Sequence, residues 1–454
     1  MRRLPRLHLL ALVILFGGAL LFSAEARPAS ALTPSFTLGT LTAFSNPSSI
    51  AFGPDGRLYV ASQSTIRAYT LDATGLMVTD VEPIATGQSG VLGIAFDPTA
   101  APSPAVLYAS RQNTAATDSY EGVISTYTGP TWTRSDVITG LPSSAPFTNH
   151  FTNGLAFDEN GLLYMANGSN TDAGIQSPNY PETPLSAAIL VADVNDAQFD
   201  GTITYSPAGV PVDDEVNQTG GDVSVFAPGT RNPYDLVIHS NGRIYATDNG
   251  PNGPTTSTSC MTTGGGVEQN DELNLIEMGD YYGFPNRNRG RSDARQCVYH
   301  APSEGSGVDF TAPILTLPAH CSCDGIAEYT SSQFGGAMQG DLLIAQFVLG
   351  NVLRVTLSGD GQSVVANATL QSGLNNPLDV TVGPTGVIYI AQFGAGEISY
   401  LDPVPKPVGG VTELPSLAAG GSGLGVVGMV VASAVAAAGA VVLGLRVRLW
   451  RRRK

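Results

Sequence analysis

Positive charge is scarce in this sequence. The chain has 22 Lys and Arg residues against 38 Asp and Glu residues. Ten of the basic residues lie in residues 1–31 and 446–454 together with only one acidic residue, so residues 32–445 contain 12 basic and 37 acidic residues. A surface this acidic repels phosphate backbones and anionic lipid headgroups. The composition therefore argues against nucleic acid as a partner of the central part of the chain.

Both ends of the chain carry a long apolar run. Residues 9–22 follow three arginines and precede small-residue cleavage patterns, which predicts a secretory signal peptide over residues 1–31, with a membrane-spanning segment as the alternative. Residues 423–445 are apolar and uncharged over about 20 residues, the length that crosses a bilayer core. The basic residues 446–454 then stay cytoplasmic. We expect an exported protein anchored by a C-terminal transmembrane helix, or one whose apolar tail is a sorting signal that is later removed.

Cysteine is also rare. The chain has four cysteines, Cys260, Cys297, Cys321 and Cys323. An even number of cysteines in an exported chain favours two disulfides. Pairing Cys260 with Cys297 and Cys321 with Cys323 is one solution, and a crossed pairing is the other. A metal site at the Cys-Ser-Cys motif is a weaker interpretation, because no second Cys-x-x-Cys or His-x-x-His pair accompanies it.

One pattern recurs through the exported domain, which we place at residues 32–402, before a Pro- and Gly-rich linker over 403–422. The pattern is an alternating apolar run, a turn with glycine and a second apolar run. Its six copies lie at 49–62, 93–110, 154–168, 235–250, 325–347 and 379–394. Alternation around such a turn predicts a β-hairpin. Six hairpins, each with room for about four strands, predict an all-β fold, a six-bladed β-propeller. A five- or seven-bladed propeller with one miscounted blade is the alternative.

Four further segments carry polar residues between the strand-like runs. They read GQSGVLGIAFDP at 87–98, NHFTNGLAFDENGLLY at 149–164, FAPGTRNPYDLVIHSNGRIYATDNGPNG at 226–253 and NDELNLIEMGDYYGFPN at 270–286. In this order they resemble the soluble quinoprotein sugar dehydrogenases, the glucose/sorbosone dehydrogenase family. The resemblance implies PQQ- and calcium-dependent oxidation of an aldose sugar at C1 to the lactone, with hydride transfer to the quinone. The electron acceptor is not implied.

The resemblance also assigns roles to single residues. It makes His150 the general base, which suits a histidine because its pKa lies near neutral pH. It makes Gln88, Arg231, Asn232 and Asn249 contacts of the quinone cofactor. A guanidinium suits the carboxylates of PQQ because it donates two parallel hydrogen bonds.

Two calcium sites follow from the same resemblance. The peptide carbonyls of Gly250 and Pro251 match those that hold the catalytic calcium, which would polarise the quinone. Asp271, Glu272 and the carbonyl of Tyr282 match a second, structural calcium site. A hard cation prefers such oxygen ligands.

The sequence departs from the family at several charged positions. Ser169 stands where the family has an acid, and Val348, Asn376 and Leu378 stand where its best-studied branch has cations. The arginines at 287, 289 and 291 are candidates to compensate. These departures support an alternative, a non-catalytic calcium-binding propeller that binds glycan or protein at the cell surface. A propeller lactonase is a third class, but the sequence offers no clear set of convergent carboxylates for it.

Overall fold

The computed structural model describes residues 34–112, 122–142, 150–171, 182–206, 216–251, 270–289 and 310–404. All of them belong to one compact unit, Met1–Pro407. The expected signal peptide, the apolar segment 423–445, the basic tail, nearly all of the linker, and Cys260 and Cys297 lie outside the described residues. Across the described residues, no helix has the length and apolarity needed to span a bilayer.

The six hairpins expected from the repeat are all present. They are β2 (Pro47–Phe52) with β3 (Leu58–Ser62), β6 (Gly93–Phe96) with β7 (Val106–Gln112), β10 (Thr152–Phe157) with β11 (Leu163–Asn167), β16 (Pro233–Ile238) with β17 (Ile244–Asp248), β20 (Cys323–Glu328) with β21 (Leu342–Gln346), and β24 (Pro377–Val382) with β25 (Ile388–Gln392). Gly56, Gly161, Gly242 and Gly386 take positive φ in four of the turns. A residue with a side chain adopts that conformation only with strain, so glycine permits these tight reversals.

Two more strands complete each hairpin to a four-stranded antiparallel blade. In blade order they are β4 (Thr65–Leu71) and β5 (Val78–Thr86), β8 (Gly122–Thr128) and β9 (Thr133–Leu141), β12 (Ala188–Ala192) and β15 (Ser224–Pro228), β18 (Asn270–Ile276) and β19 (Leu315–Ala319), β22 (Asn351–Leu357) and β23 (Val364–Ser372), and β26 (Glu397–Pro403) and β1 (Phe36–Ala43). A separate hairpin, β13 (Thr204–Ser206) with β14 (Asn217–Gly220), and the short 3-10 helices η1 (Arg287–Arg289) and η4 (Gln333–Gly336) lie in the connections.

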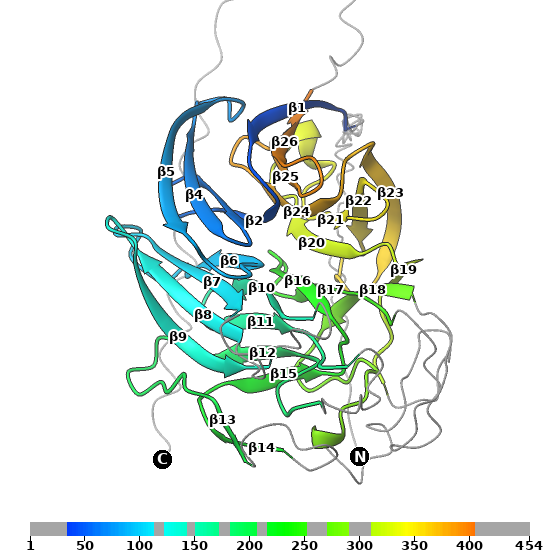
Figure 1. Ribbon diagram of the computed structural model, residues 1–454. Coiled ribbons are helices and arrows are strands. Elements are labelled where there is room, and N and C mark those ends of the chain that lie inside the picture. Colours follow the sequence, from blue (N-terminus) through cyan, green and yellow to red (C-terminus); the bar gives the residue numbers. More distant parts are fainter. Residues whose placement is uncertain are drawn as a thin grey trace, which may run out of the picture. The chain divides into compact units, whose positions relative to one another are not determined.

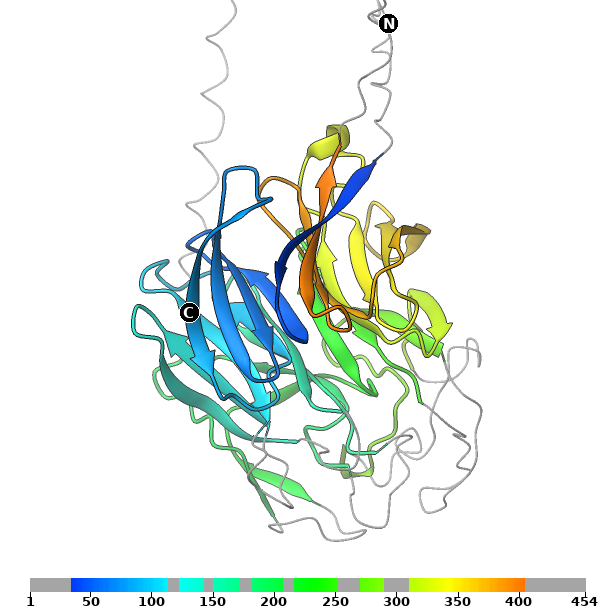
Figure 2. The ribbon, with the colours of Figure 1, turned by 45° about the horizontal axis from the view of Figure 1, so that its top comes forward.

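The blades form a closed ring, with the innermost strand of each blade next to the centre (Figures 1 and 2). The inner strands β2, β6, β10, β16, β20 and β24 contact one another in that order, and β24 contacts β2. The N-terminal strand β1 pairs with β26 and so completes the last blade. The prediction of a six-bladed β-propeller is therefore confirmed.

The core consists of apolar layers between neighbouring blades. Tyr59, Leu107 and Tyr127, for example, pack together between the first and second blades. Similar layers fill the other five interfaces. Each blade is therefore stabilised by burial against its two neighbours.

Polar side chains on the inner strands also join the blades. Asp235 accepts the backbone N–H of Ile326 in the next blade at 3.1 Å, and Asp379 accepts that of Ile50 at 2.7 Å. Gly154 makes room for Asp235, because a Cβ at residue 154 would lie 2.0 Å from the Asp235 carboxylate. Burial raises the pKa of Asp379 to about 7.

The hairpin register brings the predicted site residues to one end of the channel. Thr152 pairs with Asn167 and Pro233 with Asp248, so each inner strand begins where the following strand ends. We call this end, where β10 and β16 begin and β11 and β17 finish, the site end.

Candidate active site

His150 lies just before β10 at the site end and is only 5% exposed. Its Nδ1 lies 2.9 Å from Oγ of Ser169 and 3.2 Å from the Ser169 carbonyl oxygen. Because a carbonyl oxygen can only accept, Nδ1 carries the hydrogen and Nε2 carries the lone pair. Burial, with a smaller effect of the Arg231 charge, lowers the pKa of His150 well below its usual 6.5. The imidazole is therefore neutral at physiological pH, in a form that can accept a proton.

The Arg-Asn pair precedes β16, in the blade next to the histidine. The backbone N–H groups of Arg231 and Asn232 both donate to the Asp248 carboxylate, over 2.7 to 3.1 Å. The Arg231 guanidinium donates to the Asn249 carbonyl at 2.9 Å, and the Arg231 carbonyl accepts the N–H of Ser169 at 2.7 Å. Ser169 thus contacts both the His150 imidazole and the backbone of Arg231. The predicted residues Arg231, Asn232 and Asn249 come together around Asp248, which the sequence had not singled out.

Asn249 links the fourth and fifth blades. Its Nδ2 donates to Asp324 at the start of β20, over 3.0 Å. Its Oδ1 is buried and has no hydrogen-bond partner among the residues that the structure describes. Burial raises the pKa of Asp324 to about 7, although hydrogen bonds from Asn249 and Ser322 act in the opposite direction. A buried amide oxygen without a donor, next to a carboxylate, suits a hard cation.

Gly250 and Pro251 follow and are buried. The N–H of Gly250 donates to one oxygen of Asp271 at 3.0 Å, and the other oxygen accepts the N–H of Cys323 at 3.2 Å. Cys321 and Cys323 form a disulfide, which is one of the two pairings that the sequence left open. Both thiols are consumed in this bond, so the interpretation of the Cys-Ser-Cys motif as a thiolate metal site is wrong. Asp271 ties the Gly-Pro turn to the start of the fifth blade.

Asp271 and Glu272 are adjacent on β18, and successive strand side chains point to opposite faces. Asp271 faces the disulfide. Glu272 pairs directly with Asp248 on β17 and accepts a hydrogen bond from Asn274 at 3.1 Å. Burial and the negative charge of Asp248 raise the pKa of Glu272 to about 8. The structure therefore does not bring together the two acids that the resemblance assigned to one calcium site.

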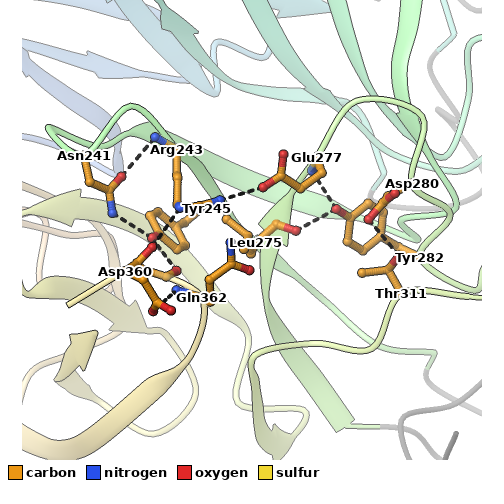
Figure 3. Close-up of polar contacts among 11 residues, drawn as sticks. Asn241, Arg243, Tyr245, Leu275, Glu277, Asp280, Tyr282, Thr311, Asp360 and Gln362 are labelled. Atoms are coloured by element: carbon orange, nitrogen blue, oxygen red, sulfur yellow. Dashed lines mark hydrogen bonds and ion pairs between the residues drawn. The ribbon is translucent and has the colours of Figure 1, made fainter. Parts of the chain in front are cut away.

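Tyr282, assigned to the same site through its carbonyl, has a buried side chain. Its hydroxyl donates to the Leu275 carbonyl at 2.6 Å and accepts the N–H of Glu277 at 2.9 Å (Figure 3). Both partners lie at the end of β18 away from Asp271. The side chain of Tyr282 thus serves packing, and only its backbone remains a candidate ligand.

Gln88 is half-buried between the first and second blades. Its Oε1 accepts the Tyr127 hydroxyl at 2.6 Å, and its Nε2 donates to the Thr86 carbonyl at 2.9 Å. The amide oxygen and the amide nitrogen of Gln88, which was predicted to contact the cofactor, thus both form hydrogen bonds within the protein.

The three positions that carry cations in the best-studied branch of the family are uncharged here. Val348 lies in the turn after β21 and is 61% exposed, whereas Leu378 is buried. The Asn376 amide donates to the Phe347 carbonyl at 3.1 Å. Of the arginines proposed as substitutes, Arg291 lies outside the described residues. Arg289 donates to the carbonyls of Ser186 and Ala187, just before β12.

A cavity of about 370 Å³ borders the first and last blades at the site end. It is lined by Phe44, Ser45, Asn46, Ser62, Gln63, Ser64, Thr65, Arg67 and Phe393. Among the described residues that line it, Arg67 carries the only positive charge, and its guanidinium lies 5.3 Å from the Phe44 ring centroid. The Ser64 carbonyl accepts the N–H of Gln88 at 3.0 Å. The cavity therefore places a cation beside the loop of Gln88, at a position that the sequence had not indicated.

Sequence reasoning missed three buried acids, Asp248, Asp324 and Glu182. Asp248 ends β17 and Asp324 begins an inner strand, so the hairpin register alone could have placed both at the site end. Glu182 gave no such signal, because it lies inside the long insertion that follows the third hairpin.

The match with known proteins is broad. A family described as Glucose / Sorbosone dehydrogenase matches residues 44–399. The chain belongs to this family. Within it, quinoprotein glucose dehydrogenase B of Acinetobacter calcoaceticus is 26% identical over 359 residues, which cover 72% of this chain and 71% of that protein. An aldose sugar dehydrogenase of Escherichia coli K12 is 23% identical over 259 residues, 56% of this chain and 60% of that protein. The predicted resemblance is confirmed.

Solved structures share the propeller fold. A Thermus thermophilus oxidoreductase described as a glucose dehydrogenase superposes with a TM-score of 0.56 at 21% identity, over 82% of this chain and 100% of that one. The PQQ-bound aldose sugar dehydrogenase of Streptomyces coelicolor gives 0.53 at 20% identity, over 82% and 100%. A calcium structure of a Trichoderma reesei enzyme of carbohydrate-active family AA12 gives 0.55 at 18% identity, over 82% and 97%.

Proposed function

We propose that this protein oxidises an aldose sugar at C1 to the lactone, with PQQ and calcium as cofactors. The observation that carries the proposal is the neutral His150 imidazole held beside the Arg231 segment at the channel end. The family membership and the named activities of the relatives support the sugar as the substrate class.

The protein's own part in the chemistry would be proton transfer. With its hydrogen on Nδ1, His150 can take the proton of the C1 hydroxyl at Nε2. As that O–H bond breaks, the C1–H bond breaks with its electron pair and a C1=O bond forms. When bound, PQQ would accept this hydride and calcium would polarise the quinone as a Lewis acid. Because the pKa of His150 is depressed, the base stays unprotonated well below neutral pH.

The residues present fit calcium. The Gly250-Pro251 turn follows Asn249, whose Oδ1 is buried without a partner in the described part of the chain. Asp271 accepts the Gly250 N–H, Asp248 lies two residues before the turn, and Glu272 pairs with Asp248. Burial raises the pKa of all three acids and so disfavours their negative charge. A divalent cation would offset that charge with the oxygen ligands it prefers.

The residues also fit the quinone, although less completely. Arg231 and Asn232 would hold its polar edge, together with Asn249. The carboxylates of PQQ need cations, and Arg67 in the neighbouring cavity is the candidate that replaces the cations absent at Val348 and Asn376.

The test is reconstitution of the full-length protein with PQQ and calcium, followed by dye reduction with a panel of aldoses. We expect stoichiometric PQQ uptake and turnover that His150→Asn lowers about 10²- to 10⁴-fold. His239→Asn is the matched control, because the Nε2 atom of His239 bonds the Gly340 carbonyl at the opposite end of the fourth blade. It should keep its activity per folded molecule. Absence of PQQ uptake and of turnover would contradict the proposal, as would a fully active His150→Asn.

The alternative, a calcium-binding propeller without redox activity, is favoured by the uncharged Val348, Asn376 and Leu378. It predicts calcium binding and glycan or protein binding without PQQ uptake, so the same reconstitution distinguishes the two.

For the location of the enzyme, we propose export by residues 1–31 and anchoring by residues 423–445. Deleting residues 423–454 should release the protein from the membrane fraction. Retention of the shortened chain in that fraction would contradict the anchor.

A further inference from the structure

The base of the proposed reaction has an unusual partner. His150 binds the hydroxyl and the carbonyl oxygen of Ser169 through Nδ1, where a carboxylate commonly orients a catalytic imidazole. The Ser169 hydroxyl donates its own hydrogen to the Thr171 carbonyl at 2.5 Å. Its oxygen therefore meets the imidazole as an acceptor, and the hydrogen stays on Nδ1. The tautomer of the base thus depends on the conformation of residues 169–171.

A buried carboxylate holds this turn. Glu182 is 4% exposed and accepts the N–H of Asn170 at 3.0 Å, together with the N–H and hydroxyl of Thr171 at 2.8 and 2.6 Å. The hydroxyl of Ser186 donates to the same carboxylate at 2.5 Å. Each oxygen of Glu182 thus accepts two hydrogen bonds. A protonated carboxyl group carries a hydrogen on one oxygen, whereas an ionised carboxylate can accept at both oxygens. The four donors therefore fit the ionised form of Glu182.

Arg289 supplies a positive charge near Glu182. The Arg289 guanidinium is fixed by the carbonyls of Ser186 and Ala187, and its charge stabilises the ionised form of Glu182. Against this, burial raises the pKa of Glu182. The charge of Arg231 acts on His150 instead, where it adds to the lowering of the pKa by burial. The order from base to cation is His150, Ser169, the turn, Glu182 and Arg289.

We propose that Glu182 is the positioning residue for the base, and that it replaces the missing acid at position 169 by acting through the turn. Glu182 touches neither the imidazole nor, in this proposal, the sugar. It holds residues 169–171 so that two acceptors of Ser169 face Nδ1, which places the hydrogen on Nδ1 and the lone pair on Nε2. The inference rests on the proposed function for its catalytic meaning, but the tautomer itself can be observed without cofactor or substrate.

The experiment compares ¹⁵N-histidine spectra of the full-length protein with and without Glu182→Gln, using His150→Asn to assign the signals. The wild type should show one Nδ1–H tautomer for His150. Glu182→Gln replaces one carboxylate oxygen by an NH₂ group that meets two of the four donors, so the turn should loosen and the signals should move to a mixture of tautomers. Reconstituted with PQQ and calcium, this variant should lose about 10- to 100-fold in kcat with less than a threefold change in KM. Glu277→Gln, an exposed acid of the fourth blade, is the matched control and should change neither.

Rescue separates positioning from mere structural support. Ser169→Asp places a carboxylate directly at Nδ1, so Glu182→Gln combined with Ser169→Asp should recover the single tautomer and most of kcat. Ser186→Ala, which removes one of the four donors, is a milder variant that should shift the tautomer in the same direction if Glu182→Gln does not fold. Unchanged His150 signals in Glu182→Gln and in Ser186→Ala, or a double variant as impaired as Glu182→Gln, would overturn the proposal. Wild-type protein with the single tautomer but no turnover would refute the proposed function and leave the role of Glu182 in the tautomer standing.

Discussion

The two halves of the site end differ in the residues that accompany their buried acids. In the third and fourth blades, the neutral His150 and the Arg231 guanidinium accompany the buried acids Asp248, Asp271 and Glu272. In the fifth and sixth blades, Asp324 and Asp379 are buried with pKa values raised to about 7. The residue proposed as the base and the cation that acts on it therefore belong to one half, and the other half holds buried acids whose ionised form an external cation would stabilise.

The exposed surface of the two halves differs as well. The turn after β21 presents Val348 and Leu349, which are 61% and 48% exposed. His150 and Arg231 are almost completely buried. If the protein binds the anionic cofactor proposed above, the half that carries the histidine would supply more of the contacts, and substitutions in the two halves test this difference.

The largest effect should come from removing the cation of that half. Arg231→Met leaves the Asn249 carbonyl without its guanidinium donor and removes the positive charge near the buried Asp248, and losing a hydrogen bond to a charged group costs about 1.5–3 kcal/mol. The free energy of unfolding from urea titration should fall by this amount. Arg231→Lys keeps the charge and should lose clearly less. Equal losses in the two variants would show that the charge of Arg231 is not what stabilises this half.

Calcium should come next. If the ion binds the folded protein only, calcium at 100 times its dissociation constant raises the free energy of unfolding by about 2.7 kcal/mol. Melting curves with calcium, with magnesium and with a chelator measure this effect. Asp271→Asn should remove more of it than Glu272→Gln, because Asp271 contacts the Gly250 N–H whereas Glu272 points to the opposite face of β18. Identical melting in calcium and in chelator would contradict a calcium site.

The channel acid Asp379 should make stability depend on pH. Its pKa is about 7 in the folded state and near 3.8 when unfolded, so the folded state binds the extra proton between these values. Its contribution to stability is therefore complete below the unfolded pKa and is lost as the pH rises through about 7. From pH 5 to pH 8 the loss should be roughly 2–3 kcal/mol. Urea unfolding of Asp379→Asn should show a correspondingly weaker pH dependence, and an unchanged dependence would contradict the assignment.

The smallest effect should come from adding charge to the uncharged half. Val348→Lys should tighten PQQ binding by about 0.5–1 kcal/mol, a few-fold in the dissociation constant. Met278→Lys adds the same charge at a more exposed position, since Met278 is 78% exposed beyond the opposite end of β18. If the two variants bind PQQ equally, the gain reflects net charge rather than a local contact.

The sequence was a good guide to the fold because the propeller repeats a local signal. Hairpins depend on alternation and on glycine in the turn, and both are readable over about 15 residues. The Arg-Asn pair and His150 were also predictable, because they precede inner strands and so reach the same end of the channel.

Other parts of the site were beyond such reasoning. That Asp271 faces the disulfide and Glu272 faces Asp248 depends on which way β18 is turned between its neighbours. That the charge of Arg289 acts on Glu182 depends on a tertiary contact between residues more than 100 positions apart in the chain.

By itself, then, the sequence determined the number of blades, because that follows from local periodicity, and its resemblance to a known family indicated the residue proposed as the base. The tertiary structure alone decided which acids and cations meet around that base. Such contacts join residues far apart in the chain, and their energies depend on burial, which no local pattern records.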